Sequence, residues 1–123
     1  GLYQLDRQSK KTIISKQFKQ IVDLIGDQDN IIISNKNSEV ILLSSVDLSE
    51  KWRVRLDEVI EKVSVQGDQI FCVGSTGSIY SVDLNGKVRW GDFLDGKISP
   101  HLFQYQSSVY FSSASTSLFR YKL

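Results

Sequence analysis

The sequence repeats itself at a step of 39 residues, and this repeat restricts the fold more than any other feature. Three sets of apolar residues keep that step without a gap through three copies. The sets are Leu24, Val63 and Leu102; Ile31, Ile70 and Val109; and Val40, Ile79 and Leu118. A period of about 20 to 50 residues is typical of solenoids, propellers and other arrays, in which each copy is one supersecondary unit. A fold without internal repeats, such as an immunoglobulin-like sandwich, is therefore not expected.

Each copy contains short apolar runs that suit β-strands, because they are rich in β-branched and aromatic residues and partly alternate with polar ones. In the best-defined copy we expect strands near 60–66, 69–74, 78–83 and 87–93. Turn residues separate them, and Asn85-Gly86 is the strongest signal because a type I′ turn needs positive φ at both central residues. A helix is the alternative around Asp57 to Val63, where apolar residues keep helical spacing in this copy alone.

Four antiparallel strands in roughly 40 residues, repeated along the chain, match the size and strand number of a β-propeller blade. The sequence therefore predicts an all-β chain that forms a single partial β-propeller domain of about three 39-residue repeats. We expect an incomplete blade at 1–16, blades at 20–55 and 60–93, and another incomplete blade at 97–123. Closed propellers have about four to eight blades, so we expect this chain to be stable only beside more β-structure, from the same polypeptide or from partner chains.

The segment from Gly77 to Trp90, GSIYSVDLNGKVRW, resembles the signature of the pyrroloquinoline-quinone-like β-propeller repeat. The family pattern is a glycine, an apolar-tyrosine pair, a small residue, x-Asp, a Thr-Gly-Lys-like turn and a tryptophan. The segment Ile98-Ser99-Pro100 also resembles the family's entry to the innermost strand. The second copy keeps the tryptophan as Trp52, whereas the first copy has Ile13 or Ile14 in its place.

The resemblance implies structural roles for the residues of this motif. Trp52 and Trp90 are expected to pack onto the adjacent blade beside its turn, with stacking on a ligand or a base as the alternative. Tyr80 recurs as an aromatic residue one copy later, and Gly86 belongs to the turn itself. Asp83 starts that turn and is expected to accept hydrogen bonds from backbone amides, as aspartate does in turns.

The family includes quinone-dependent dehydrogenases, which hold their cofactor through calcium-coordinating carboxylates and amides and often an adjacent cysteine pair. Cys72 is the only cysteine and has no such neighbour. The acidic segment 27–30 is nearest to a calcium loop, but it lacks the glycine and the terminal glutamate of one. It also falls where the other copies have turns. We therefore expect a turn there in preference to a metal site, no bound cofactor and no catalytic residues.

One polar residue recurs on the strand expected to be innermost in each blade. The three are Asp23, Lys62 and His101. Innermost strands line the central channel of a propeller, so these side chains are candidates to face one channel. A solvated channel wall is the simpler interpretation, because a single histidine cannot build a His-rich metal site.

The formal net charge of +1 removes the electrostatic signature of a dedicated nucleic-acid binder. No apolar run approaches the roughly 20 residues of a membrane-spanning helix. We therefore expect a non-catalytic scaffold that binds other proteins. Among the non-enzymatic proteins with this repeat, the chain resembles the scaffold lipoproteins of bacterial outer-membrane assembly, and this resemblance favours the periplasm or cell envelope. The alternative is a fragment of a quinone-dependent dehydrogenase whose cofactor ligands lie outside this chain.

Overall fold

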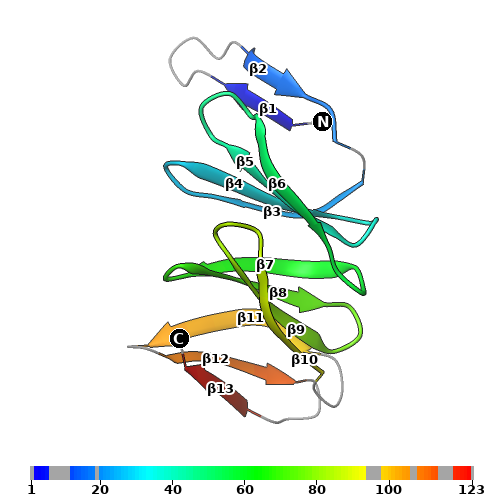
Figure 1. The fold of residues 1–123 in the computed structure, drawn as a ribbon, viewed down its shortest axis with the longest axis vertical. Coiled ribbons are helices and arrows are strands. Elements are labelled where there is room, and N and C mark those ends of the chain that lie inside the picture. The colour runs from blue at the N-terminus through cyan, green and yellow to red at the C-terminus, as the bar shows by residue number, and fades with distance from the viewer. Residues whose placement is uncertain are drawn as a thin grey trace.

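The described part of the chain is built from β-strands alone. The computed structural model describes residues 2–5, 12–18, 20–93, 98–105, 108–113 and 118–122. Within these ranges it contains thirteen strands and no helix (Figure 1). The first sheet has β1 (Leu2–Leu5) and β2 (Thr12–Lys16), and the last has β11 (Ile98–Tyr105), β12 (Ser108–Ser113) and β13 (Leu118–Lys122).

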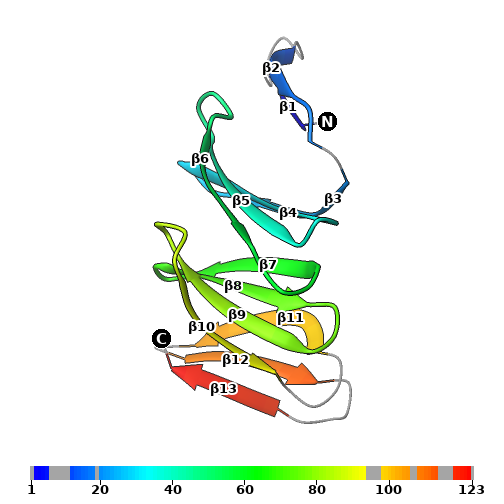
Figure 2. The same ribbon diagram turned by 45° about the vertical axis from the view of Figure 1, so that its right-hand side comes forward.

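Two complete four-stranded antiparallel sheets lie between them. The first contains β3 (Ile21–Gly26), β4 (Asn30–Asn35), β5 (Glu39–Ser44) and β6 (Glu50–Arg55). The second contains β7 (Ile60–Gln66), β8 (Gln69–Gly74), β9 (Ser78–Asp83) and β10 (Val88–Phe93). Within each sheet, strands that are consecutive in sequence pair with each other, so the sheets are antiparallel meanders. The four sheets follow one another along the long axis of the molecule (Figures 1 and 2).

The strand registers repeat with the sequence. The residue pairs Leu24–Ile33, Val63–Cys72 and Leu102–Phe111 face each other across the first two strands of successive sheets. The same pairs of strands each contain a register shift just before these residues. In the segment that has helical spacing, residues 60–63 belong to β7 and residues 57–59 are a non-helical connection, so the helix alternative is wrong. Burial of this segment within the sheet stack overrides its local helical pattern.

A β-bulge precedes the tryptophan position in each outer strand. The register places Ile14 opposite Gln4, Trp52 opposite Leu42, and Trp90 opposite Ser81, each next to a shift. Ile14, and not Ile13, therefore holds the tryptophan position in the first sheet. A bulge adds one residue and increases the local twist. The bulge thus recurs at the same register position in these three sheets.

The core lies between the sheets. One cluster joins the β3–β6 and β7–β10 sheets and contains Ile32, Val40, Leu42, Leu56, Ile60, Val63, Ile70, Cys72 and Val82. A second cluster, Ile33, Ile41 and Leu43, covers the opposite face of β4 and β5. The middle strands are therefore buried on both faces, which explains their unbroken apolar runs. Each such side chain contributes about 1.5–3 kcal/mol by leaving water.

Candidate functional site

Asp23 links the innermost strands of the two complete sheets. Its Oδ2 accepts a hydrogen bond from the backbone N of Val63 at 2.9 Å, and Lys62 Nζ lies 3.9 Å from the same oxygen. In its sheet, β7 pairs only with β8, so its other edge has no strand to satisfy its amides. The Asp23 carboxylate therefore takes the place of a neighbouring strand at this point. Two of the three recurrent polar residues are brought together by this contact.

The third recurrent polar residue, His101, lies in β11, and β11 lies beside β7. The His101 side chain is outside the described part of the structure. That Asp23, Lys62 and His101 face one channel therefore stays a prediction. Asp23 and Lys62 have an observed local role, because they connect two sheets.

Trp52 contacts the turn that follows β9 in the next sheet. Its indole Nε1 donates a hydrogen bond to the carbonyl oxygen of Leu84 at 2.9 Å. A Cβ atom placed on Gly86 would lie 2.8 Å from the indole ring, so the ring packs directly on that glycine. Gly86 has φ 86°, a conformation that glycine adopts without the cost of a side chain. The Asp83–Lys87 turn and Trp52 are thus fitted to each other.

Trp90 contacts the next sheet through aromatic rings. Its indole stacks on the ring of Tyr121 in β13, with centroids 4.8 Å apart and planes inclined by 14°. The ring of Phe71 meets the indole edge-on at 5.9 Å. Tyr121 Oη donates a hydrogen bond to Asp92 Oδ2, and partial burial together with this carboxylate raises the pKa of Tyr121 to about 12. The phenol therefore keeps its proton at physiological pH.

Aspartate side chains stabilise two of the turns. Asp83 Oδ1 accepts hydrogen bonds from the backbone N of Asn85 at 2.9 Å and of Lys87 at 3.0 Å. Asp27 Oδ1 accepts from the backbone N of Asp29 and of Asn30 in the same manner. The amides of Lys87 and of Asn30 are the main causes that lower the pKa of the Asp83 and Asp27 carboxyls, respectively. Segment 27–30 is thus a hydrogen-bonded turn.

The turns after β4 and β8 are stabilised by two different side chains that occupy the same place. In the first, Asn35 Oδ1 accepts hydrogen bonds from the backbone N of Asn37 and of Glu39. In the second, Gly74 stands at the position of Asn35, and a Cβ there would lie 1.8 Å from Glu58 Oε1. The Glu58 carboxylate fills the space that the asparagine side chain occupies one repeat earlier.

Glu58 makes the hydrogen bonds that the missing asparagine would make. It accepts from Thr76 N at 2.9 Å, from Thr76 Oγ1 at 2.6 Å and from Ser78 Oγ at 2.7 Å. Partial burial acts to raise the pKa of Glu58, but the hydrogen bonds from Thr76 and Ser78 outweigh it and lower the pKa below its usual value. The charged carboxylate is therefore the form that holds this turn.

We expect Glu58→Ala to lower the free energy of unfolding by about 1–3 kcal/mol, because it leaves the turn donors without their charged acceptor. Adding Gly74→Asn to Glu58→Ala should restore most of the loss, since the second turn would then match the first. Urea unfolding followed by circular dichroism measures both effects. If Gly74→Asn fails to restore stability in the absence of Glu58, the equivalence of the two turns is wrong.

The same contact predicts a pH dependence. Because the pKa of Glu58 is lower in the folded chain, its contribution is present above the unfolded-state pKa and is lost as the pH falls through the folded value. The stability difference between the native chain and Glu58→Gln should therefore shrink in acid. A difference that stays constant from neutral pH to below pH 4, about the unfolded glutamate pKa, would contradict this role.

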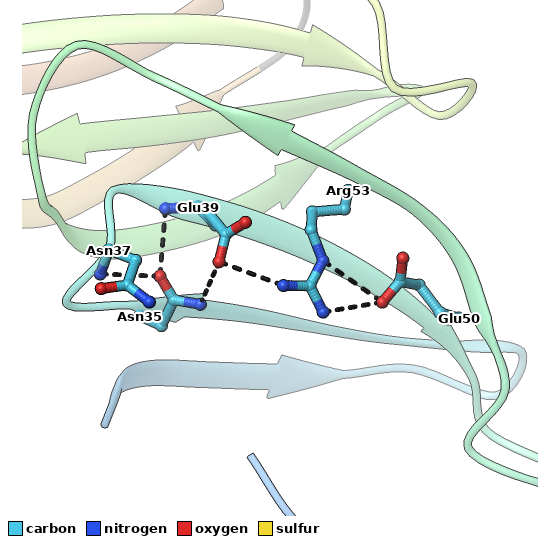
Figure 3. A network of polar contacts seen from close by, with 5 residues as sticks. All are labelled: Asn35, Asn37, Glu39, Glu50 and Arg53. Atoms are coloured by element: carbon cyan, nitrogen blue, oxygen red, sulfur yellow. Dashed lines mark hydrogen bonds and ion pairs between the residues drawn. The ribbon is translucent and has the colours of Figure 1, made fainter. Parts of the chain in front are cut away.

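A polar network lies over β5 and β6 (Figure 3). Arg53 Nη1 donates to Glu39 Oε1 at 3.1 Å, and its Nη2 donates to Glu50 Oε1 at 2.8 Å. Asn35 Nδ2 donates to the same Glu39 oxygen at 3.0 Å. The hydrogen bond from Asn35, followed by that from Arg53, lowers the pKa of Glu39. Asn35, Glu39 and Arg53 line a pocket of about 220 Å³ together with Phe18 and others.

The β7–β10 sheet has a larger groove of about 480 Å³. It is lined by Asp57, Glu58, Ser78, Tyr80, Val88, Gly91, Asp92 and Phe93. A Cβ on Gly91 would lie 2.9 Å from the ring of Tyr80, so the ring packs against this glycine. Tyr80, singled out in the sequence as a structural residue, thus forms part of an open groove as well as of the core edge. Sequence reasoning missed this groove.

The thiol of Cys72 is not activated as a nucleophile. Cys72 is fully buried, and desolvation raises the pKa of its thiol to about 12, so it stays protonated. Within the described ranges, no three His, Cys, Asp or Glu side chains gather closely enough to hold a metal ion. These same ranges contain no helix that is long and apolar enough to cross a membrane.

Sheets of four antiparallel strands that repeat and pack face to face define the fold as a β-propeller, and the two complete sheets are two of its blades. No protein-family model matches the sequence, and no curated protein matches it. Solved structures do. BamB from Moraxella catarrhalis is 20% identical with a TM-score of 0.70, over 83% of this chain and 33% of that one.

Two further solved structures are similar. BBS1N, solved in complex with ARL6DN, is 11% identical with a TM-score of 0.73, over 96% of this chain and 42% of that one. The computationally designed Ika4 protein is 12% identical with a TM-score of 0.70, over 84% of this chain and 66% of that one. This chain thus spans between a third and two thirds of these neighbours. At such identities the similarity establishes the propeller fold alone.

Proposed function

We propose that this chain is a non-catalytic β-propeller module that binds other proteins as a scaffold. The observation that carries the proposal is the outer strand β10, which forms an edge of its sheet. It exposes Phe93 by 66% and Val88 by 38%, and Leu84 in the preceding turn is also exposed. An edge strand with exposed apolar side chains is a template for pairing with another chain.

The equivalent edge strand of the preceding blade is protected. β6 exposes Glu50, Lys51, Arg53 and Arg55, and charged side chains are a common device against edge pairing. At the places of Glu50, Arg53 and Arg55, β10 exposes Val88, Gly91 and Phe93. Its exposed charges are Arg89 and Asp92 alone. Since the two strands hold the same place in successive blades, their difference supports a specific use of the β10 edge.

The proposal extends to the kind of scaffold. A role in outer-membrane assembly, in the periplasm or cell envelope, agrees with the likeness to BamB and with the resemblance to pyrroloquinoline-quinone-like repeats. BBS1N, another propeller neighbour, was solved with a protein bound. No specific observation favours a dehydrogenase fragment.

Site-specific photocrosslinking tests the scaffold role. A benzophenone amino acid at Phe93 in the full chain, expressed in its own cells, should give a discrete adduct with one partner protein. The control is the same amino acid at Gln28, which is exposed in the turn after β3, away from the β10 edge. Equal adducts from both positions, or none from Phe93, would contradict the proposal.

A further inference from the structure

The groove of the β7–β10 blade lacks the side chain that fills its counterpart in the preceding blade. The register pairs Arg53 with Ile41 across β6 and β5, and Gly91 with Tyr80 across β10 and β9. Gly91 therefore holds the place of Arg53. The pocket beside Arg53 measures about 220 Å³, whereas the groove beside Gly91 measures about 480 Å³. In the second blade the ring of Tyr80 lies against Gly91 in place of the Arg53 side chain, and the larger groove opens beside that ring.

The chemistry of the larger groove suits a guanidinium. Three carboxylates line it, those of Asp57, Glu58 and Asp92, and none of them forms an ion pair with another described residue. Glu58 accepts hydrogen bonds from Thr76 and Ser78, and Asp92 accepts one from Tyr121, so both remain charged acceptors without a neutralising cation in the described part of the chain. The ring of Tyr80 and the exposed side chain of Phe93 supply aromatic surface. Burial raises the pKa of Tyr80, and the negative charges of Glu58 and Asp57 raise it further by a smaller amount. The groove around Tyr80 therefore has a negative electrostatic potential, which attracts a cation.

The preceding blade shows how such a cation is held. Arg53 lies between two carboxylates, with Glu39 accepting from one terminal nitrogen and Glu50 from the other (Figure 3). Both glutamates come from β5 and β6, the strands equivalent to β9 and β10. In the β7–β10 blade the carboxylates stand at other positions around the groove, and the chain provides no cation between them among its described residues.

We propose that this groove binds an arginine side chain of a partner protein on the ring of Tyr80, beside the place that Arg53 occupies in the preceding blade. The inference rests on the proposed scaffold function and names the chemistry of the partner segment. A planar guanidinium donates to carboxylates in a fork and stacks on an aromatic ring, which lysine does less well. The adjoining β10 edge lets the backbone of the same segment pair with the blade.

The test uses a short acetylated peptide in which arginine alternates with valine, titrated into the full chain and followed by amide chemical shifts. We expect saturable binding with shifts at Tyr80, Val88 and Phe93, which weakens as salt is added. Replacing each arginine by citrulline, which keeps the shape and loses the charge, should weaken binding by about tenfold. Asp57→Asn with Asp92→Asn should weaken it by about fivefold.

The matched control is Asp29→Asn with Asp68→Asn, which removes the same charge from exposed turns outside the groove. It should leave binding of the arginine peptide within about twofold at moderate salt. Equal weakening by both double variants, equal affinity for the citrulline peptide, or no binding of either peptide would overturn the proposal. If Phe93 still crosslinks to a partner in those cases, the scaffold function stands and only the arginine preference is lost.

Discussion

Trp90→Ala should lower the free energy of unfolding by about 3–5 kcal/mol, the range for removing a large aromatic side chain from a packed site. The indole stacks on Tyr121 in the next sheet and meets Phe71 in its own, so its loss opens a cavity between two sheets. Urea unfolding of the full chain, followed by far-ultraviolet circular dichroism, gives the value.

Trp90→Phe is the control, because it keeps an aromatic ring against Tyr121 and should recover a large part of the loss. Trp52→Ala should cost a comparable amount, since that indole also contacts the adjacent blade. A change below about 0.5 kcal/mol for Trp90→Ala, the range of ordinary surface substitutions, would mean that the tryptophan does not join the two sheets.

Gly86→Ala should cost about 2–5 kcal/mol for two separate reasons. An L-residue at φ 86° pays about 1–2 kcal/mol of backbone strain. The new Cβ would also lie 2.8 Å from the Trp52 ring, and such overpacking costs about 1–3 kcal/mol. Thermal or urea unfolding of the single variant measures the sum.

Gly67→Ala separates the two contributions. Gly67 has φ 66°, but a Cβ added to it would have nothing within 4 Å, so only the backbone strain applies. In a Trp52→Ala background, Gly86→Ala should cost no more than Gly67→Ala, because the clash has been removed. If Gly86→Ala costs the same with and without Trp52, the ring and the turn are not in contact.

Much of the architecture could be predicted because the same strand pattern occurs in three copies, which can be compared with one another. The strands expected at 60–66, 69–74 and 78–83 agree with β7, β8 and β9, and the last strand begins one residue later than expected. Local helical spacing near Ile60 did not decide the outcome, because the other copies share the strand pattern and the core buries this segment on the sheet.

What escaped prediction depends on contacts between residues far apart in the chain. Asp23 accepts from an amide 40 residues away, and Glu58 stabilises a turn 18 residues ahead. Neither pairing follows from periodicity. The signal was nevertheless present in the aligned copies, because glycine replaces Asn35 as Gly74 and replaces Arg53 as Gly91. Where a glycine aligns with a larger side chain of another copy, a different side chain fills the space: Glu58 at Gly74, and the ring of Tyr80 at Gly91.

For the two tryptophans, the sequence predicted the role and the structure identifies the contacts. Their recurrence favoured a structural role over ligand stacking, and the resemblance supplied the idea of a contact with the adjacent blade. The structure adds the partners, Leu84 and Gly86 for one and Tyr121 for the other. These two sets of contacts hold adjacent blades together.

Nuclear Overhauser spectroscopy on the full chain detects these contacts directly. We expect contacts from the Trp52 indole N–H proton to the α-protons of Gly86, which lie in the following blade. We also expect contacts between the rings of Trp90 and Tyr121. Contacts of both indoles to residues of their own sheets alone would show that successive repeats do not pack as the blades of a propeller.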